Sequence, residues 1–251
     1  MPARHACWGF LSRLLSDRGE RAAAIAMPVG APVPSLQLSF DRAPRFVLLL
    51  LSIIAELMLA PLLARSEFGL HTAQVLALLV MIAALWASGA QGASALLFVP
   101  AIVAHVLAAY WGAAPMRLAA LTLRIVFFSY VTGLIMWRTL RSSEVTIDTI
   151  AGAACAYTLL ALVWGGIYLL LEFLHPGSFN IPAAWLMGRA GDPAPALVYF
   201  SFVTLTTVGY GDITPAWPGA GGLAVAEAVV GQLYLAITIA RLVGLHAARR
   251  S

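Results

Sequence analysis

The chain has 251 residues, of which 61% are apolar and 10% are charged, and its mean hydropathy is +0.90. Soluble domains are about 45–50% apolar and about 25% charged. The composition therefore excludes an ordinary soluble enzyme and predicts an all-α membrane protein whose partner is the lipid bilayer. The net charge of +4 does not indicate nucleic-acid binding, because all 15 basic residues are arginines scattered around apolar blocks.

Six apolar blocks have about the 20 residues needed to cross a hydrocarbon core. Four of them predict a four-helix transmembrane domain over 45–141, with helices at 46–64, 70–88, 93–111 and 118–137. The other two, at about 147–173 and about 220–245, flank a segment that Gly, Pro and Asp interrupt, and together they form a second domain over 142–251. Residues 1–44 are expected to be a cytoplasmic tail, either a short interfacial helix or a disordered segment, with the start of translation at Met1 or Met27 left open.

Arginine counts predict the orientation, because cytoplasmic loops carry an excess of positive charge. With both termini on one side, that side has ten arginines and the other has three, so both termini are expected in the cytoplasm. The richness in arginine and alanine is typical of a GC-rich bacterial genome, which predicts the inner membrane. The ten are Arg4, Arg13, Arg18, Arg21, Arg42, Arg45, Arg138, Arg141, Arg249 and Arg250, and the three are Arg65, Arg117 and Arg189.

The interrupted segment between the last two blocks predicts a half-membrane helix that enters and returns. Asp192 is a good N-cap and Pro193 a good first helical residue, so we expect a short helix at about 193–206. Its C-terminus would carry roughly half a negative charge from the helix dipole, which favours a cation just beyond it.

An extended stretch, 207–211, follows this helix. Irregular backbone at membrane depth must be buried in protein or line a water-filled path. Gly209 and Gly211 tolerate positive φ, so carbonyl oxygens from Thr207 to Tyr210 can face one side, with the Thr207 hydroxyl as a further oxygen. A row of carbonyls facing an axis is a site for a dehydrated cation. Tyr210 is expected to point toward the aromatic side chains of Tyr199, Phe200 and Phe202.

The hexapeptide Thr207-Val208-Gly209-Tyr210-Gly211-Asp212 resembles the selectivity filter of potassium channels, and the flanking helices extend the resemblance from about Ile147 to Leu245. The chain as a whole resembles bacterial six-helix potassium channels with a two-helix ion-channel pore domain. The resemblance implies that Gly211 and the carbonyls of Thr207, Val208, Gly209 and Tyr210 bind K⁺ as a permeant ion, without any cofactor. One filter loop per chain cannot close a four-fold ring, so it implies a homotetramer.

Residues around the hexapeptide are candidates for filter support. Many bacterial relatives have a glutamate where this chain has Val203, so Tyr199 is the expected hydrogen-bond partner of Asp212. Thr206, directly before the hexapeptide, is a further candidate. Gly231 lies 20 residues after Gly211, where such channels often carry a hinge glycine. Glu227, one turn earlier, is expected to accept hydrogen bonds from the pore helix behind the filter.

Charged residues in the first four helices do not have the spacing of a voltage sensor. Arg117, Arg124, Arg138 and Arg141 are too far apart, and the terminal ones are interpreted as snorkelling anchors. Glu56 and Arg124 are candidates for an intramembrane charge pair, with a structural role favoured over a sensing role. His105 is interpreted as a core or interface histidine, with a metal or proton-relay role as the alternative.

The inner helix offers a candidate gate, which consists of Gln232, Leu235, Ile239 and Val243 at three- and four-residue steps. The alternative is that this stripe packs on the preceding helix. The sequence has no paired histidines, phosphate loop or activated nucleophile, so no catalytic residue and no enzyme activity are expected.

Together these features predict passive, potassium-selective conduction without steep voltage gating. The alternatives are a cation channel of relaxed selectivity and a non-conducting carrier or sensory membrane protein. The chain stops at Ser251, after the last helix, so no cytosolic ligand-binding domain is expected in it. The gating stimulus, the rectification, associated subunits and the role of the first four helices stay open.

Overall fold

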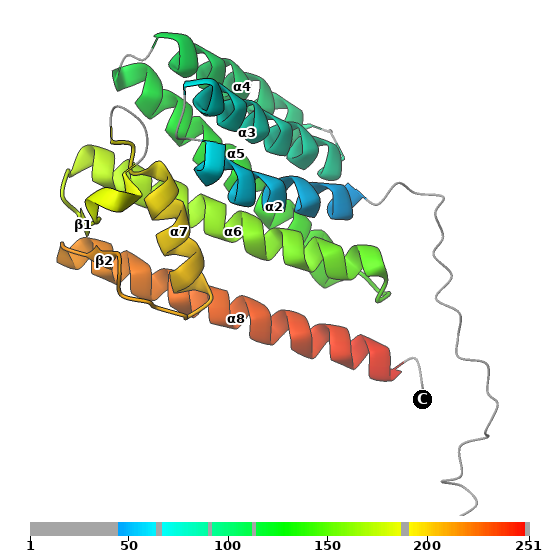
Figure 1. Ribbon diagram of the computed structural model, residues 1–251. Coiled ribbons are helices and arrows are strands. Elements are labelled where there is room, and N and C mark those ends of the chain that lie inside the picture. Colours follow the sequence, from blue (N-terminus) through cyan, green and yellow to red (C-terminus); the bar gives the residue numbers. More distant parts are fainter. Residues whose placement is uncertain (1–44, 64–66, 90–91, 112–113, 187–190, 249–251) are drawn as a thin grey trace, which may run out of the picture. The chain divides into compact units, whose positions relative to one another are not determined.

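The computed structural model describes residues 45–63, 67–89, 92–111, 114–186 and 191–248. The fold described here is that of the unit Arg42–Ser251. The expected tail over 1–44 lies outside the described residues. Figure 1 shows long helices that lie side by side and a short helix, α7, that is inclined to them. The helices are α2 (Arg45–Leu63), α3 (Glu67–Ala87), α4 (Ala93–Trp111), α5 (Ala114–Arg141), α6 (Ile147–Leu174), η1 (Ala183–Trp185), α7 (Ala194–Leu205) and α8 (Pro218–Ala248).

Three of the described helices are long and apolar enough to cross a membrane: α5, α6 and the part of α8 from Pro218 to Leu245. Shorter apolar stretches lie in α3 (Thr72–Ala87) and α4 (Ser94–Ala109). The fold is that of an all-α membrane protein, with four helices ahead of a helix, short helix and helix module. Two starts differ from those predicted by three residues or more: α3 begins at Glu67, where residue 70 was expected, and α5 at Ala114, where residue 118 was expected.

Helix α6 lies at the centre of the unit and packs against α2, α5, α7 and α8 (Figure 1). Two adjacent glycines let its neighbours approach closely. A Cβ on Gly165 would lie 3.0 Å from Val198 Cα in α7, and a Cβ on Gly166 would lie 2.9 Å from Ile125 Cγ1 in α5. Small residues at helix contacts are typical of membrane proteins, where packing replaces the hydrophobic driving force.

The main core extends from the four-helix part into α6 and α8. Its fully buried side chains come from five helices, and Tyr234 of α8 joins them. Phe127 of α5 contacts Phe98 of α4 with ring centroids 5.8 Å apart. The same core therefore holds the first four helices to the two long helices that follow. The fully buried members include Leu49, Ile53, Met81, Phe127, Val131, Ile135, Cys155 and Leu159.

A second, aromatic core surrounds α7. Three rings form a triangle in edge-to-face geometry, with centroids 5.2–5.4 Å apart. They belong to Tyr168 of α6, Phe179 of the segment after α6 and Phe200 of α7. Such pairs contribute about 0.5–1.5 kcal/mol beyond their buried area. The triangle fixes α7 against α6.

A two-stranded antiparallel pair connects the segment after α6 to the segment before α8. Strand β1 (Phe179–Asn180) pairs with β2 (Thr214–Pro215), with Phe179 opposite Pro215 and Asn180 opposite Thr214. The Ser178 carbonyl also accepts hydrogen bonds from the N–H groups of Ala216 and Trp217.

Arginine and tryptophan side chains meet at the end of the unit where α5 ends and α2 begins. The Arg45 guanidinium lies 5.6 Å from the Trp86 ring, and that of Arg141 lies 3.7 Å from the Trp137 ring. Aromatic and arginine side chains are typical of the membrane interface, which fits the expected anchoring role of Arg141.

Candidate functional site

The short helix α7 starts one residue later than predicted. Pro193 is the N-cap and Ala194 the first helical residue, whereas the sequence analysis placed the cap at Asp192 and the first helical position at Pro193. The Asp192 side chain still serves the helix start, since its Oδ1 accepts a hydrogen bond of 2.9 Å from the Ala194 N–H.

The C-terminal end of α7 is closed by the backbone that follows it. The Val203 carbonyl accepts hydrogen bonds from the N–H groups of Val208 and Gly209, at 3.0 and 3.3 Å, and the Thr204 carbonyl accepts one from Thr207. The Tyr157 hydroxyl of α6 donates to the Leu205 carbonyl at 3.0 Å. These bonds satisfy carbonyls that a helix terminus leaves unpaired and fix the start of the filter segment, defined here as 207–211.

The filter segment alternates in backbone conformation. φ is +60° at Thr207, +58° at Gly209 and +78° at Gly211, and Thr207 is the one non-glycine residue with positive φ in the described chain. The alternation is the one that the sequence analysis required for carbonyls on a common side. A β-branched residue at positive φ is uncommon, and the sequence pointed to Gly209 and Gly211 for this conformation but not to Thr207. Its side chain and those of the rest of the segment are exposed in the single chain.

The residues proposed to support the filter lie around this segment. The Tyr199 hydroxyl donates a hydrogen bond of 2.8 Å to Asp212 Oδ2. Thr206 caps α7 and donates to the Phe202 carbonyl at 2.6 Å. Val203 contributes its carbonyl, as described above.

Tyr210 does not pack on the aromatic residues expected to surround it. Its side chain is 72% exposed in the single chain, while Tyr199 stacks on Trp185 at 4.2 Å and Phe200 contacts Tyr168. The aromatic neighbours within the chain are thus already engaged by α6 and the segment before α7. The packing of Tyr210 on the pore helices of an assembled pore stays a prediction.

Glu227 of α8 contacts the short helix α7, as expected. The residue is fully buried. Its Oε1 lies 2.5 Å from the Ser201 hydroxyl of α7 and its Oε2 lies 2.5 Å from the Tyr168 hydroxyl of α6. A buried carboxyl therefore connects α6, α7 and α8.

The proposed hinge and gate residues differ in their surroundings. Gly231 is buried in α8, which runs without a break from Pro218 to Ala248. Ile239 and Val243 are 58% and 61% exposed and Gln232 is exposed too, but Leu235 packs against the main core. The four candidates lie on one face of α8, and Leu235 lies at the edge of that face nearest the side that carries Gly231, Tyr234 and Thr238 and packs against the rest of the chain.

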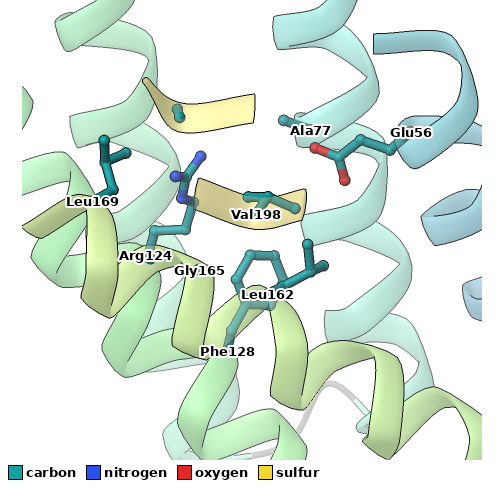
Figure 2. Close-up of a pocket in the computed structure, with 10 residues that line it drawn as sticks. Glu56, Ala77, Arg124, Phe128, Leu162, Gly165, Leu169 and Val198 are labelled. Atoms are coloured by element: carbon teal, nitrogen blue, oxygen red, sulfur yellow. The ribbon is translucent and has the colours of Figure 1, made fainter. Parts of the chain in front are cut away.

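Glu56 of α2 and Arg124 of α5 face one cavity, which also reaches α7 (Figure 2). The cavity has a volume of about 60 Å³, and Gly165, Leu169 and Val198 are among its lining residues. Among the described residues Glu56 and Arg124 form no ion pair within 4.0 Å. The structure thus brings the two charges to a common space, large enough for water, without a direct contact.

His105 has a buried Nε2 atom without a hydrogen-bond partner among the described residues. No group of three or more His, Cys, Asp or Glu side chains that could hold a metal occurs there either.

Several residues of the site were not found from the sequence. Ser201, Tyr157 and Tyr168 make the contacts described above, and the Glu172 carboxylate accepts hydrogen bonds from the N–H groups of Gly177, at 2.7 Å, and Phe179, at 3.2 Å. A polar side chain within an apolar block is the signal that could have directed attention to them, since such groups need partners in a membrane.

Comparison with known families matches residues 156–245 to a family described as ion channel. Searches among curated proteins and solved structures gave no significant match. The matched range runs from within α6 to within α8 and contains α7, the filter segment and Glu227. The match supports an ion-channel pore domain in this part of the chain.

Proposed function

We propose that the protein is a potassium-selective channel through which K⁺ flows passively. The single observation that carries this proposal is the alternation of φ at Thr207, Gly209 and Gly211 directly after the C-terminus of α7. It supplies the backbone needed to turn successive carbonyls from Thr207 to Tyr210 toward one axis. The ion-channel match over 156–245 and the resemblance of the hexapeptide to potassium filters support the same conclusion. No cofactor is required, and K⁺ is the permeant ion.

The proposed assembly is a homotetramer. One chain contributes one filter segment, and its Val208 and Tyr210 side chains are 52% and 72% exposed. Helix α8 also exposes apolar side chains on more than one side, among them Val229, Leu233 and Ile239. Four copies around an axis would cover these surfaces with neighbouring subunits, lipid or the water-filled path.

The proposed channel lies in a bacterial inner membrane with both termini in the cytoplasm and is not steeply voltage-gated. Arg124 is the one charged residue in α5 between Arg117 and Arg138, and each charge that crosses the field contributes only about 2.3 kcal/mol per 100 mV. One arginine within the helix per subunit is too few for steep voltage dependence.

The proposal is tested by the reversal potential of purified protein in planar bilayers with unequal K⁺ and Na⁺. A potassium channel gives unitary currents that reverse near the K⁺ equilibrium potential. Currents that reverse far from it would indicate a cation channel of relaxed selectivity, and the absence of unitary currents would indicate a carrier or sensory protein. Gly209→Asp should abolish conduction, because it places a charged side chain at a residue with positive φ, while the oligomer measured by native mass spectrometry stays intact.

A further inference from the structure

The Glu227 carboxyl is fully buried and lies outside the proposed ion path. It connects three helices, since its two oxygens lie within 2.5 Å of Ser201 in α7 and Tyr168 in α6. Both partners are neutral hydroxyls. In the described part of the chain no arginine or histidine nitrogen lies within 4.0 Å of this carboxyl. An ionised carboxylate buried in such surroundings is strongly disfavoured.

The hydrogens of this cluster can be counted. Ser201 Oγ lies 2.5 Å from Glu227 Oε1 and also 2.7 Å from the Ala161 carbonyl oxygen. A serine hydroxyl has one hydrogen but can accept as well as donate. With an ionised Glu227, Ser201 can serve only one of these two acceptors fully.

A proton on Glu227 Oε1 removes this conflict. The carboxylic acid then donates to Ser201 Oγ, Ser201 donates to the Ala161 carbonyl, and the Tyr168 hydroxyl donates to Oε2. Each of the three hydrogens has one acceptor, and each short contact of the cluster is a hydrogen bond. Fully satisfied buried networks of this kind fix a single arrangement of the groups that form them.

The cluster lies close to the filter segment. Four residues after Ser201, Leu205 contacts Gly231, which itself lies four residues after Glu227; a Cβ on Gly231 would be 2.8 Å from the Leu205 carbonyl oxygen. The filter segment begins two residues beyond Leu205. The hydrogen bonds of Glu227 thus fix α7 one helical turn before its end.

We propose that Glu227 is a proton-binding site, and that its neutral carboxylic acid positions α7 and through it the filter segment. The effect on the filter rests on the proposed function as a potassium channel. The proton site itself does not depend on it. Glu227 is a positioning residue, since it acts on the ion only through Ser201 and α7.

The protonation is tested first by infrared spectroscopy of the full chain in lipid. The difference between wild type and Glu227→Gln should contain the carbonyl stretch of a protonated carboxylic acid, which the difference between wild type and Asp148→Asn should lack. Ser201→Ala should shift this band, because it removes the acceptor of the carboxylic proton. Loss of carboxylate bands instead of the carbonyl band in Glu227→Gln would overturn the assignment.

The positioning role is tested by the K⁺ to Na⁺ permeability ratio. Glutamine offers an N–H donor to Ser201 and an oxygen acceptor to Tyr168, so Glu227→Gln should keep the ratio within about twofold of wild type. Glu227→Leu should lower the ratio by about tenfold, because it leaves the Ser201 and Tyr168 hydroxyls without this partner. If Glu227→Leu does not assemble, Ser201→Ala takes its place, with the same direction expected.

The outcomes separate this inference from the proposed function. A wild type that is not potassium-selective contradicts the proposed function, while the infrared result still decides the protonation. If the wild type is potassium-selective and both Glu227→Leu and Ser201→Ala keep its K⁺ to Na⁺ permeability ratio, the positioning role is overturned. If Glu227→Gln and Glu227→Leu lower the permeability ratio equally, the positioning role does not depend on a neutral carboxylic acid, and that part of the proposal is overturned.

Discussion

Gly231 of α8 lies directly against Leu205, the last residue of α7. A Cβ on Gly231 would be 2.7 Å from Leu205 Cδ1 and 2.8 Å from the Leu205 carbonyl oxygen. The second contact is with backbone, so a side-chain rotation cannot relieve it. The close approach of two helices, rather than a bend in one of them, is thus the visible reason for a glycine at this position.

Gly231→Ala is predicted to destabilise the protein by about 1–3 kcal/mol, the usual effect of overpacking a well-packed site. The measurement is the apparent melting temperature of the purified oligomer. Gly244→Ala is the matched control, since nothing lies within 4 Å of its added Cβ and the residue is in the same helix; replacing a helical glycine there should stabilise by about 0.5–1 kcal/mol. Equal melting temperatures for the two variants would contradict the packing argument.

Tyr199→Phe is predicted to speed the loss of current during sustained recording. The change removes the 2.8 Å hydrogen bond to Asp212 just beyond the filter segment. A partly exposed bond of this kind contributes about 1 kcal/mol, which corresponds to about a fivefold change in rate. Single-channel recordings measure it, with Tyr130→Phe, in α5, as the control. Unchanged decay and unchanged ion occupancy would remove Tyr199 from the filter support.

Glu56 and Arg124 are predicted to be energetically coupled, because both face the same cavity (Figure 2). In a double-mutant cycle with Glu56→Leu and Arg124→Leu, we expect a coupling of about 0.5–3 kcal/mol in stability. The pair Glu56→Leu and Asp148→Asn should be additive within about 0.5 kcal/mol. A structural role further predicts that gating of the double variant is unchanged, whereas altered gating with no coupling in stability would favour a sensing role.

Glu172→Ala is predicted to loosen the turn that follows α6. The carboxylate accepts hydrogen bonds from the Gly177 and Phe179 N–H groups, and such charge-assisted bonds contribute about 1.5–3 kcal/mol. Amide hydrogen exchange at these two residues should accelerate by about tenfold or more. Glu172→Gln, which keeps an acceptor oxygen, should show a smaller change, and equal protection in wild type and Glu172→Ala would refute the contact.

The sequence was sufficient to predict the helices, because membrane-length apolar blocks leave few alternatives. It also led to the contact between Tyr199 and Asp212, through the resemblance of the hexapeptide. It was not sufficient to predict which side of α8 packs against the rest of the chain. That helix is apolar nearly all round, so periodicity cannot say which side faces α6. The sequence therefore left open whether the gate candidates pack on the preceding helix, and the structure places Leu235 against the main core.

The cluster around Glu227 shows a second limit. Tyr168 and Ser201 lie 59 and 26 residues from Glu227 in the sequence, and no local pattern connects them. Their meeting depends on how α6, α7 and α8 pack. The positive φ of Thr207 likewise depends on surroundings that hold a β-branched residue in a conformation it would not choose alone.

The antiparallel pairing of Phe179 with Pro215 and of Asn180 with Thr214 has a mechanical consequence. Thr214 lies two residues after Asp212, so tension applied to the turn around Gly177 reaches the exit of the filter segment through backbone hydrogen bonds and bypasses α7. In the proposed channel, a molecule bound to this turn would act on the filter segment through β1 and β2 without first moving α7.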